Sequence, residues 1–189
     1  TVTNSRFINN TAGYRGGAVY LQNCTHDNCT NTSFDWCTFI NNTATVNGGA
    51  LDWHDGAHDG IVSNSVFTNN TAGSNGGAIF WVGDNGNVLY CNFTSNVAKG
   101  ISLDEHGNIG DGGAIIWSGM NGTVDNCRFI DNEAVKNDAY DFGGRGGAVY
   151  LQNCTHGNCT NTTFTNVYFE NNTAGTNGGA LDWHEGAHD

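Results

Sequence analysis

The segment LDWHDGAHD at 51–59 gathers two imidazoles and several carboxylates, and it returns as LDWHEGAHD at 181–189. Two His side chains beside carboxylates could hold a zinc or copper ion. The candidate ligands are His54, His58, His184 and His188. Their H-x3-H spacing suits a helix, but the segment contains glycine and has the composition of a loop. Solvated loop residues are therefore the default interpretation, and the sequence predicts no metal and no other cofactor.

A second candidate for chemistry is the irregular insertion KGISLDEHGNIGDGG at 99–113, which carries Asp104, Glu105, His106 and Asp111. Polysaccharide hydrolases and lyases need paired carboxylates, or a carboxylate with a basic proton acceptor, in a groove. An acidic surface loop is the simpler interpretation. The chain holds only 6 Lys and Arg against 18 Asp and Glu, so an anionic polysaccharide would find little to bind. We predict no catalytic residues.

Asparagine followed by any residue and then Ser or Thr is the acceptor motif for N-glycosylation. It occurs at Asn9, Asn23, Asn28, Asn31, Asn41, Asn69, Asn92, Asn121, Asn153, Asn158, Asn161 and Asn171. A chain this rich in Asn and Thr also makes such motifs by chance. In the recurring NNTA segments, however, the second Asn belongs to an inward column, so the first is expected to face out and accept the sugar. Glycosylation would imply a secreted protein.

The chain has 7 cysteines of two kinds. Cys24 with Cys29, and Cys154 with Cys159, share a C-x4-C spacing in loops and are expected to form two local disulfides. Metal binding is the alternative, although no second pair lies nearby. The others stand two residues before a recurring Phe and are expected to be inert, half-buried core thiols; they are Cys37, Cys91 and Cys127.

The elements that must position these residues follow from a repeat. F-x-x-N segments begin at Phe7, Phe39, Phe67, Phe93, Phe129 and Phe169. They alternate with G-G-A-[VLI] segments whose alanines are Ala18, Ala50, Ala78, Ala114, Ala148 and Ala180. The shortest repeat is about 26 residues, within the range of stacked coils. GGAVYLQNCTH at 16–26 also returns at 146–156, so a super-repeat of about 130 residues lies over the coils.

Within each repeat the pattern is that of strands. Leu51 and Trp53, like Ile79 and Trp81, stand two residues apart, and Asn-Gly and Gly-Gly pairs mark turns. A propeller blade needs about 40 residues, too many for this repeat. The sequence therefore predicts an all-β, right-handed parallel β-helix of about six coils, each with about three short strands.

Stacked coils place equivalent residues in columns about 4.8 Å apart. Phe should stack on Phe along one inner wall, and Val, Leu or Ile with Leu or Trp along another. The Gly-Gly-Ala segments should fill a tight corner. The Asn that ends each F-x-x-N motif should form an amide ladder at a turn; its members are Asn10, Asn42, Asn70, Asn96, Asn132 and Asn172.

Six F-x-x-N and six G-G-A-[VLI] motifs in strict alternation resemble the repeats of polymorphic outer-membrane proteins and related adhesin-like β-helix proteins. The resemblance covers the whole chain. It implies a right-handed, pectate-lyase-like β-helix used as an exposed passenger or adhesin. The chain departs from the family in lacking a membrane β-barrel region, so the resemblance does not indicate how the protein is anchored.

Charge and hydropathy exclude several classes of partner. The formal net charge of -12 should repel nucleic acid and anionic membranes. No apolar run approaches about 18 residues, so no membrane insertion is predicted for this segment. The sequence begins and ends in the middle of its own repeat pattern. We therefore expect residues 1–189 to be one β-helix segment of a longer precursor or filament.

Together these patterns predict a structural or adhesive module at the cell surface or in an extracellular fibre, and not an enzyme. Its expected partners are other copies of itself, stacked end to end, and a surface carbohydrate or protein receptor. The alternative is a carbohydrate-active β-helix enzyme, either a polysaccharide lyase or a glycoside hydrolase. Clustered acids in a single groove would favour the enzyme, whereas repeated loops favour the rod.

Overall fold

The computed structural model describes residues 1–22, 31–54, 57–101, 110–137, 142–152 and 161–183. In these ranges every regular element is a strand of two or three residues, and 24 strands form four sheets, here called A to D. Sheet A contains β1 (Val2–Thr3), β5 (Ser33–Asp35), β9 (Ile61–Ser63), β13 (Asn87–Leu89), β17 (Thr123–Asp125) and β21 (Thr163–Thr165). Sheet B contains β2 (Arg6–Ile8), β6 (Thr38–Ile40), β10 (Val66–Thr68), β14 (Asn92–Thr94), β18 (Arg128–Ile130) and β22 (Tyr168–Glu170).

The other two sheets complete each coil. Sheet C contains β3 (Thr11–Ala12), β7 (Thr43–Ala44), β11 (Thr71–Ala72), β15 (Val97–Ala98), β19 (Glu133–Ala134) and β23 (Thr173–Ala174). Sheet D contains β4 (Val19–Leu21), β8 (Leu51–Trp53), β12 (Ile79–Trp81), β16 (Ile115–Trp117), β20 (Val149–Leu151) and β24 (Leu181–Trp183). No helix in the described residues is long and apolar enough to cross a membrane.

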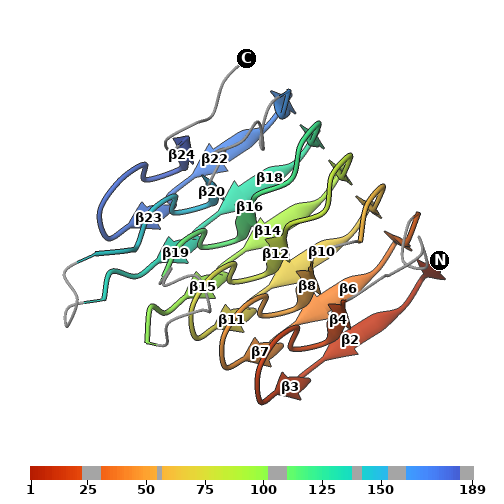
Figure 1. Cartoon of the computed structure of the whole chain (residues 1–189), viewed down its shortest axis with the longest axis horizontal. Coiled ribbons are helices and arrows are strands. Elements are labelled where there is room, and N and C mark those ends of the chain that lie inside the picture. Colours follow the sequence, from red (N-terminus) through yellow and green to blue (C-terminus); the bar gives the residue numbers. More distant parts are fainter. Residues whose placement is uncertain (23–30, 55–56, 102–109, 138–141, 153–160, 184–189) are drawn as a thin grey trace.

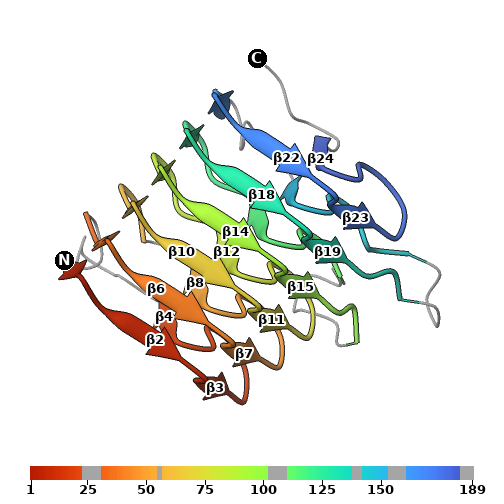
Figure 2. The same cartoon turned by 180° about the vertical axis from the view of Figure 1, so that it is seen from behind.

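Every coil adds one strand to each of the four sheets, and neighbouring strands are parallel and in register. Phe67 of β10, for example, lies opposite Phe39 of β6 and Phe93 of β14. The sheets run along the whole stack, with β2, β3 and β4 at one end and β22, β23 and β24 at the other (Figures 1 and 2). Six strands in each sheet confirm the predicted parallel β-helix of about six coils.

Two aromatic columns fill the interior, as the repeat predicts. The Phe rings of sheet B stack almost face to face, with centroids 4.6 Å apart for Phe39 and Phe67 and 4.8 Å apart for Phe67 and Phe93. On sheet D, Trp81 stacks on Trp53 at 4.3 Å and on Trp117 at 4.8 Å, and all three indoles are fully buried. Such large buried rings supply much of the hydrophobic stabilisation.

Each coil has four strands, where the sequence analysis expected about three. The chain turns sharply at residues with positive φ. These residues form three of the corners of each coil: between sheets D and A, between A and B, and between B and C. Among described residues, 17 non-glycine residues have positive φ, and 12 of these are Asn. Asn tolerates this left-handed conformation better than most residues because its short polar side chain bonds locally. The corners therefore explain much of the chain's asparagine content.

The Asn ladder is confirmed in full. The side-chain amide of Asn70 donates one bond to Asn96 Oδ1 (2.9 Å) and one to the Phe39 carbonyl (3.0 Å). Its own Oδ1 accepts from the backbone N–H of Asn42 (3.0 Å) and from the Asn42 side chain (2.9 Å). Asn42, Asn70, Asn96 and Asn132 are fully buried. The ladder thus satisfies polar groups that burial would otherwise leave costly.

The fourth corner, between sheets C and D, is made by the Gly-Gly-Ala motif. Gly76 has a φ of 65°, which favours glycine. At Gly77 a Cβ atom would lie 1.9 Å from the carbonyl oxygen of Gly113 and 2.6 Å from the backbone N of Val97. The predicted tight corner is therefore a close approach between backbones of successive coils, and it excludes any side chain.

Candidate functional site

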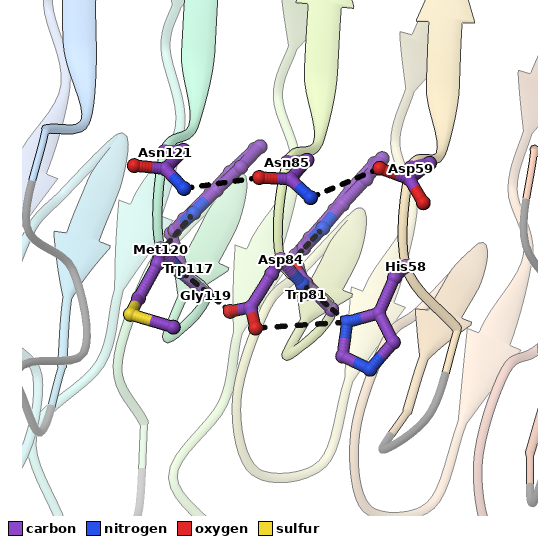
Figure 3. Close-up of polar contacts among 10 residues, drawn as sticks. His58, Asp59, Trp81, Asp84, Asn85, Trp117, Gly119, Met120 and Asn121 are labelled. Carbon is purple, nitrogen blue, oxygen red and sulfur yellow. Dashed lines mark hydrogen bonds and ion pairs between the residues drawn. The ribbon is translucent and has the colours of Figure 1, made fainter.

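The corner between sheets D and A holds His58 and three of the described glycosylation candidates, Asn31, Asn121 and Asn161. Three successive coils place Asp59, Asn85 and Asn121 at equivalent positions there (Figure 3). The Asn121 amide donates to Asn85 Oδ1, and the Asn85 amide donates to Asp59 Oδ1, each at 3.0 Å. This outer ladder is exposed, and it holds successive coils together along the rim.

His58 belongs to the same corner and faces the next coil. The backbone N–H of Asp84 donates to His58 Nδ1 at 3.0 Å, and Asp84 Oδ2 lies 3.7 Å from the same nitrogen (Figure 3). Through this contact His58 Nδ1 acts as an acceptor for the backbone of the next coil. Asp84 Oδ1 accepts from the backbone N–H of Met120 at 2.8 Å. His58 and Asp84 thus bind backbone groups of following coils.

His54 faces the preceding coil instead. The Arg15 guanidinium lies 2.8 Å from His54 Nε2 and 3.0 Å from Nδ1, and Asp52 Oδ1 lies 3.7 Å from Nδ1. All three residues are buried. The positive charge of the guanidinium beside the ring disfavours a metal cation at His54.

The two His residues of the predicted metal candidate therefore have partners in different coils. Within the described ranges, no group of three or more His, Cys, Asp or Glu could hold a metal ion. His184 and His188 lie outside the described residues, as does Asp55.

Asp111, the described acid of the irregular insertion, is fully buried and paired with Arg145. The Arg145 side chain donates from Nε to Asp111 Oδ1 at 3.0 Å, and its backbone N–H donates to the same oxygen at 3.0 Å. Burial raises the pKa of Asp111, while the bonds from Arg145 oppose that rise. Asp111 is thus engaged in holding two coils together, and its insertion partners Asp104, Glu105 and His106 lie outside the described residues.

The Asp111–Arg145 pair replaces an amide ladder, because equivalent positions in other coils hold Asn47 and Asn75. We expect Asp111→Asn alone to lower the free energy of unfolding by about 2–4 kcal/mol, since it leaves the Arg145 charge poorly compensated. The double variant Asp111→Asn/Arg145→Asn should recover most of that loss, because it restores the Asn column. Urea unfolding of the two single variants and the double variant measures this coupling. Additive losses would contradict it.

The glycosylation candidates in the described ranges are all exposed: Asn9, Asn31, Asn41, Asn69, Asn92, Asn121, Asn161 and Asn171. The distinction within NNT segments also holds, since Asn41 and Asn69 face solvent while Asn42 and Asn70 are buried. Glycosylation itself stays a prediction. The candidates Asn23, Asn28, Asn153 and Asn158 lie outside the described residues.

Cys37, Cys91 and Cys127 are buried free thiols, more deeply placed than the half-buried column expected. Burial raises the pKa of the Cys91 thiol well above its ordinary value, which keeps it protonated and a poor nucleophile. This supports an inert core role for Cys91. The predicted disulfide cysteines Cys24, Cys29, Cys154 and Cys159 lie outside the described residues.

Two exposed aromatic residues at the corner between sheets A and B were not predicted from the sequence. Trp36 and Tyr90 are 63% and 57% exposed, and both have positive φ. Each stands three residues before the Phe of an F-x-x-N motif. The other coils hold Asn at this position, namely Asn4, Asn64, Asn126 and Asn166. That departure from the column was the available signal.

Comparison with known proteins agrees with the fold. A family model described as a right handed beta helix region matches residues 1–187. Searches of curated proteins and of solved structures found no match. The match supports the predicted right-handed coil direction, and it covers almost the whole chain.

Proposed function

The chain belongs to the right-handed β-helix family, and from this fold and its surface we propose that it is a non-catalytic structural or adhesive module displayed outside the cell. The finer resemblance to polymorphic outer-membrane proteins and adhesins is part of this proposal. It rests on the twelve alternating motifs that build the coils.

One observation carries the proposal. In the described residues, the His and Asp side chains that were candidates for metal binding or catalysis form bonds between successive coils. His58 and Asp84 bind backbone groups of following coils, and Asp111 is buried against Arg145. Meanwhile the described acceptor Asn residues of the glycosylation motifs are exposed to solvent, and all but Asn92 lie at corners. This arrangement suits a rigid rod that presents its outer surface.

The duplicated segments support a long, repetitive rod. Arg15 and Arg145 occupy equivalent corner positions 130 residues apart, as do Val19 and Val149 of sheet D. We propose that such coils form part of an extracellular filament or surface fibre, in which further coils or further copies continue the stack. Each coil leaves strand edges that another coil can pair with.

The first test is glycopeptide mapping of native protein. We expect sugar at Asn9, Asn41, Asn69 and Asn171, because these residues are exposed and begin their Asn-Asn-Thr segments. Asn42 and Asn70, which are buried and lack the acceptor motif, should be unmodified. Antibody labelling of intact cells should detect the same material.

Two results would contradict the proposal. All four acceptor residues unmodified in native protein would argue against a secreted glycoprotein. Antibody labelling only after cells are permeabilised would argue against display at the surface.

A further inference from the structure

The corner between sheets A and B has an unusual backbone feature. Trp36 has a φ of 53° and Tyr90 a φ of 55°, a conformation that costs energy for bulky residues and little for Asn. The backbone bonds of the corner are the same in either case: Trp36 N–H donates to Ser63 O (3.2 Å), and Asn64 N–H donates to Leu89 O (3.0 Å). The fold thus accepts Asn here, and the aromatic rings need another reason.

The two aromatic residues are aligned along the axis of the stack. Their coils are those of Phe39 and Phe93, which are separated by one intervening coil whose Phe67 lies 4.6 and 4.8 Å from its two neighbours. Trp36 and Tyr90 are therefore about two strand spacings apart, roughly 9.5 Å. This is close to the length of an extended disaccharide unit in a β-linked polysaccharide. Parallel in-register strands fix this spacing between the two backbone positions.

Polar groups lie beside and between the aromatic residues. Asp35 Oδ1 accepts from the Ser63 hydroxyl at 2.7 Å and from the Asn64 amide at 2.8 Å, and these bonds lower the pKa of Asp35. The second carboxylate oxygen and the partly exposed Asn64 side chain offer an acceptor and a donor at the surface. Aromatic faces with hydrogen-bonding groups between them match the apolar and hydroxyl faces of a pyranose chain.

We propose that Trp36, Asn64 and Tyr90 form a binding ridge for a neutral, β-linked oligosaccharide that runs along the solenoid axis. Trp and Tyr provide large, rigid contact area at a low entropic cost. The Asp35 carboxylate and the net charge of -12 disfavour acidic glycans. The proposal rests on the surface function above and names the chemistry of its partner.

The test is titration of the 189-residue chain with cellohexaose, followed by calorimetry and Trp fluorescence. We expect binding to wild type and a loss of affinity of about tenfold or more in Trp36→Asn and in Tyr90→Asn, since each removes one stacking face. Tyr14→Asn is the matched control, because Tyr14 is 53% exposed but lies at another corner. It should bind as wild type does. Polygalacturonate, an acidic chain, should bind more weakly than cellohexaose.

Thermal unfolding of the same variants separates binding from folding. Both Asn variants should unfold at the wild-type temperature or about 2–4 °C above it, because Asn relieves the cost of the positive φ.

Several outcomes would overturn the proposal. They are an absence of cellohexaose binding at millimolar concentration, equal binding by wild type and both Asn variants, or an equal loss of affinity in Tyr14→Asn. Failure of both Asn variants to fold would show that the rings serve the fold, and it would overturn the proposal too. Because purified protein is used, a negative result leaves the surface location to be decided by the labelling of cells.

Discussion

Replacing Asn70 by alanine is expected to lower the free energy of unfolding by about 4–6 kcal/mol, because it leaves several buried groups without partners. Asn70 makes four hydrogen bonds that link three coils. Its loss would leave two Asn42 N–H groups without their acceptor, and it would remove one bond to the Phe39 carbonyl and one to Asn96 Oδ1. Alanine can replace none of these bonds, and water cannot readily reach a residue that is 0% exposed.

Urea unfolding measures this effect, and a neighbouring residue provides the control. Asn69 precedes Asn70 but is exposed, with a φ of 54°. Asn69→Gly should change the free energy of unfolding by less than about 0.5 kcal/mol, because glycine adopts positive φ freely. A similar small change in Asn70→Ala would show that the ladder adds little to stability. Asn70→Asp should be as damaging as alanine, since a carboxylate cannot donate to Phe39 or Asn96.

The second large effect is expected at the Gly-Gly-Ala corner. Gly77→Ala should lower the free energy of unfolding by about 3–5 kcal/mol, because the new methyl group would collide with backbone atoms of Gly113 and Val97. Neither neighbour can move aside alone, since both belong to the next coil and are held by parallel strand pairing. The corner must open, and the coils on either side must lose contacts.

Gly13→Ala is the matched control for this prediction. A Cβ at Gly13 would have no heavy atom within 4 Å, and Gly13 does not have a positive φ. Alanine there should be neutral or should stabilise by up to about 1 kcal/mol, because it restricts the unfolded chain. Thermal and urea unfolding of the two variants side by side give the comparison. Equal stability of Gly77→Ala and Gly13→Ala would mean that the coils can separate at this corner without cost.

Much of the fold could be predicted because like residues stack on like. The F-x-x-N motif supplies one inward Phe and one inward Asn per coil, and parallel in-register pairing turns each into a column. The Gly-Gly-Ala motif marks a corner where size alone decides the residue. Each of these constraints acts within one short segment and recurs in every coil. The columns and the corner can therefore be predicted from the repeated motifs.

The number of strands was harder to predict, because hydrophobic alternation does not reveal backbone φ. The corner that separates sheets B and C rests on positive φ at residues such as Asn41 and Asn69, and a polar Asn at a turn gives no sign of a sharp bend between two strands. The prediction of about three strands per coil treated the strands of sheets B and C as one. The positive φ at the corner between them makes them two.

The sequence alone determined the parallel stack of coils, the inner aromatic and amide columns, and the outward orientation of the first Asn in each NNT segment. The tertiary structure decided which polar residues meet. His54 and His58 are four residues apart but bind Arg15 and Asp84 in different coils, while Asp111 meets Arg145 from 34 residues away. The physical reason is that core columns repeat in every coil, whereas these contacts depend on the path of individual loops of unequal length. For Trp36 and Tyr90 the motif register gives the shared corner, and the structure adds that both side chains are exposed there.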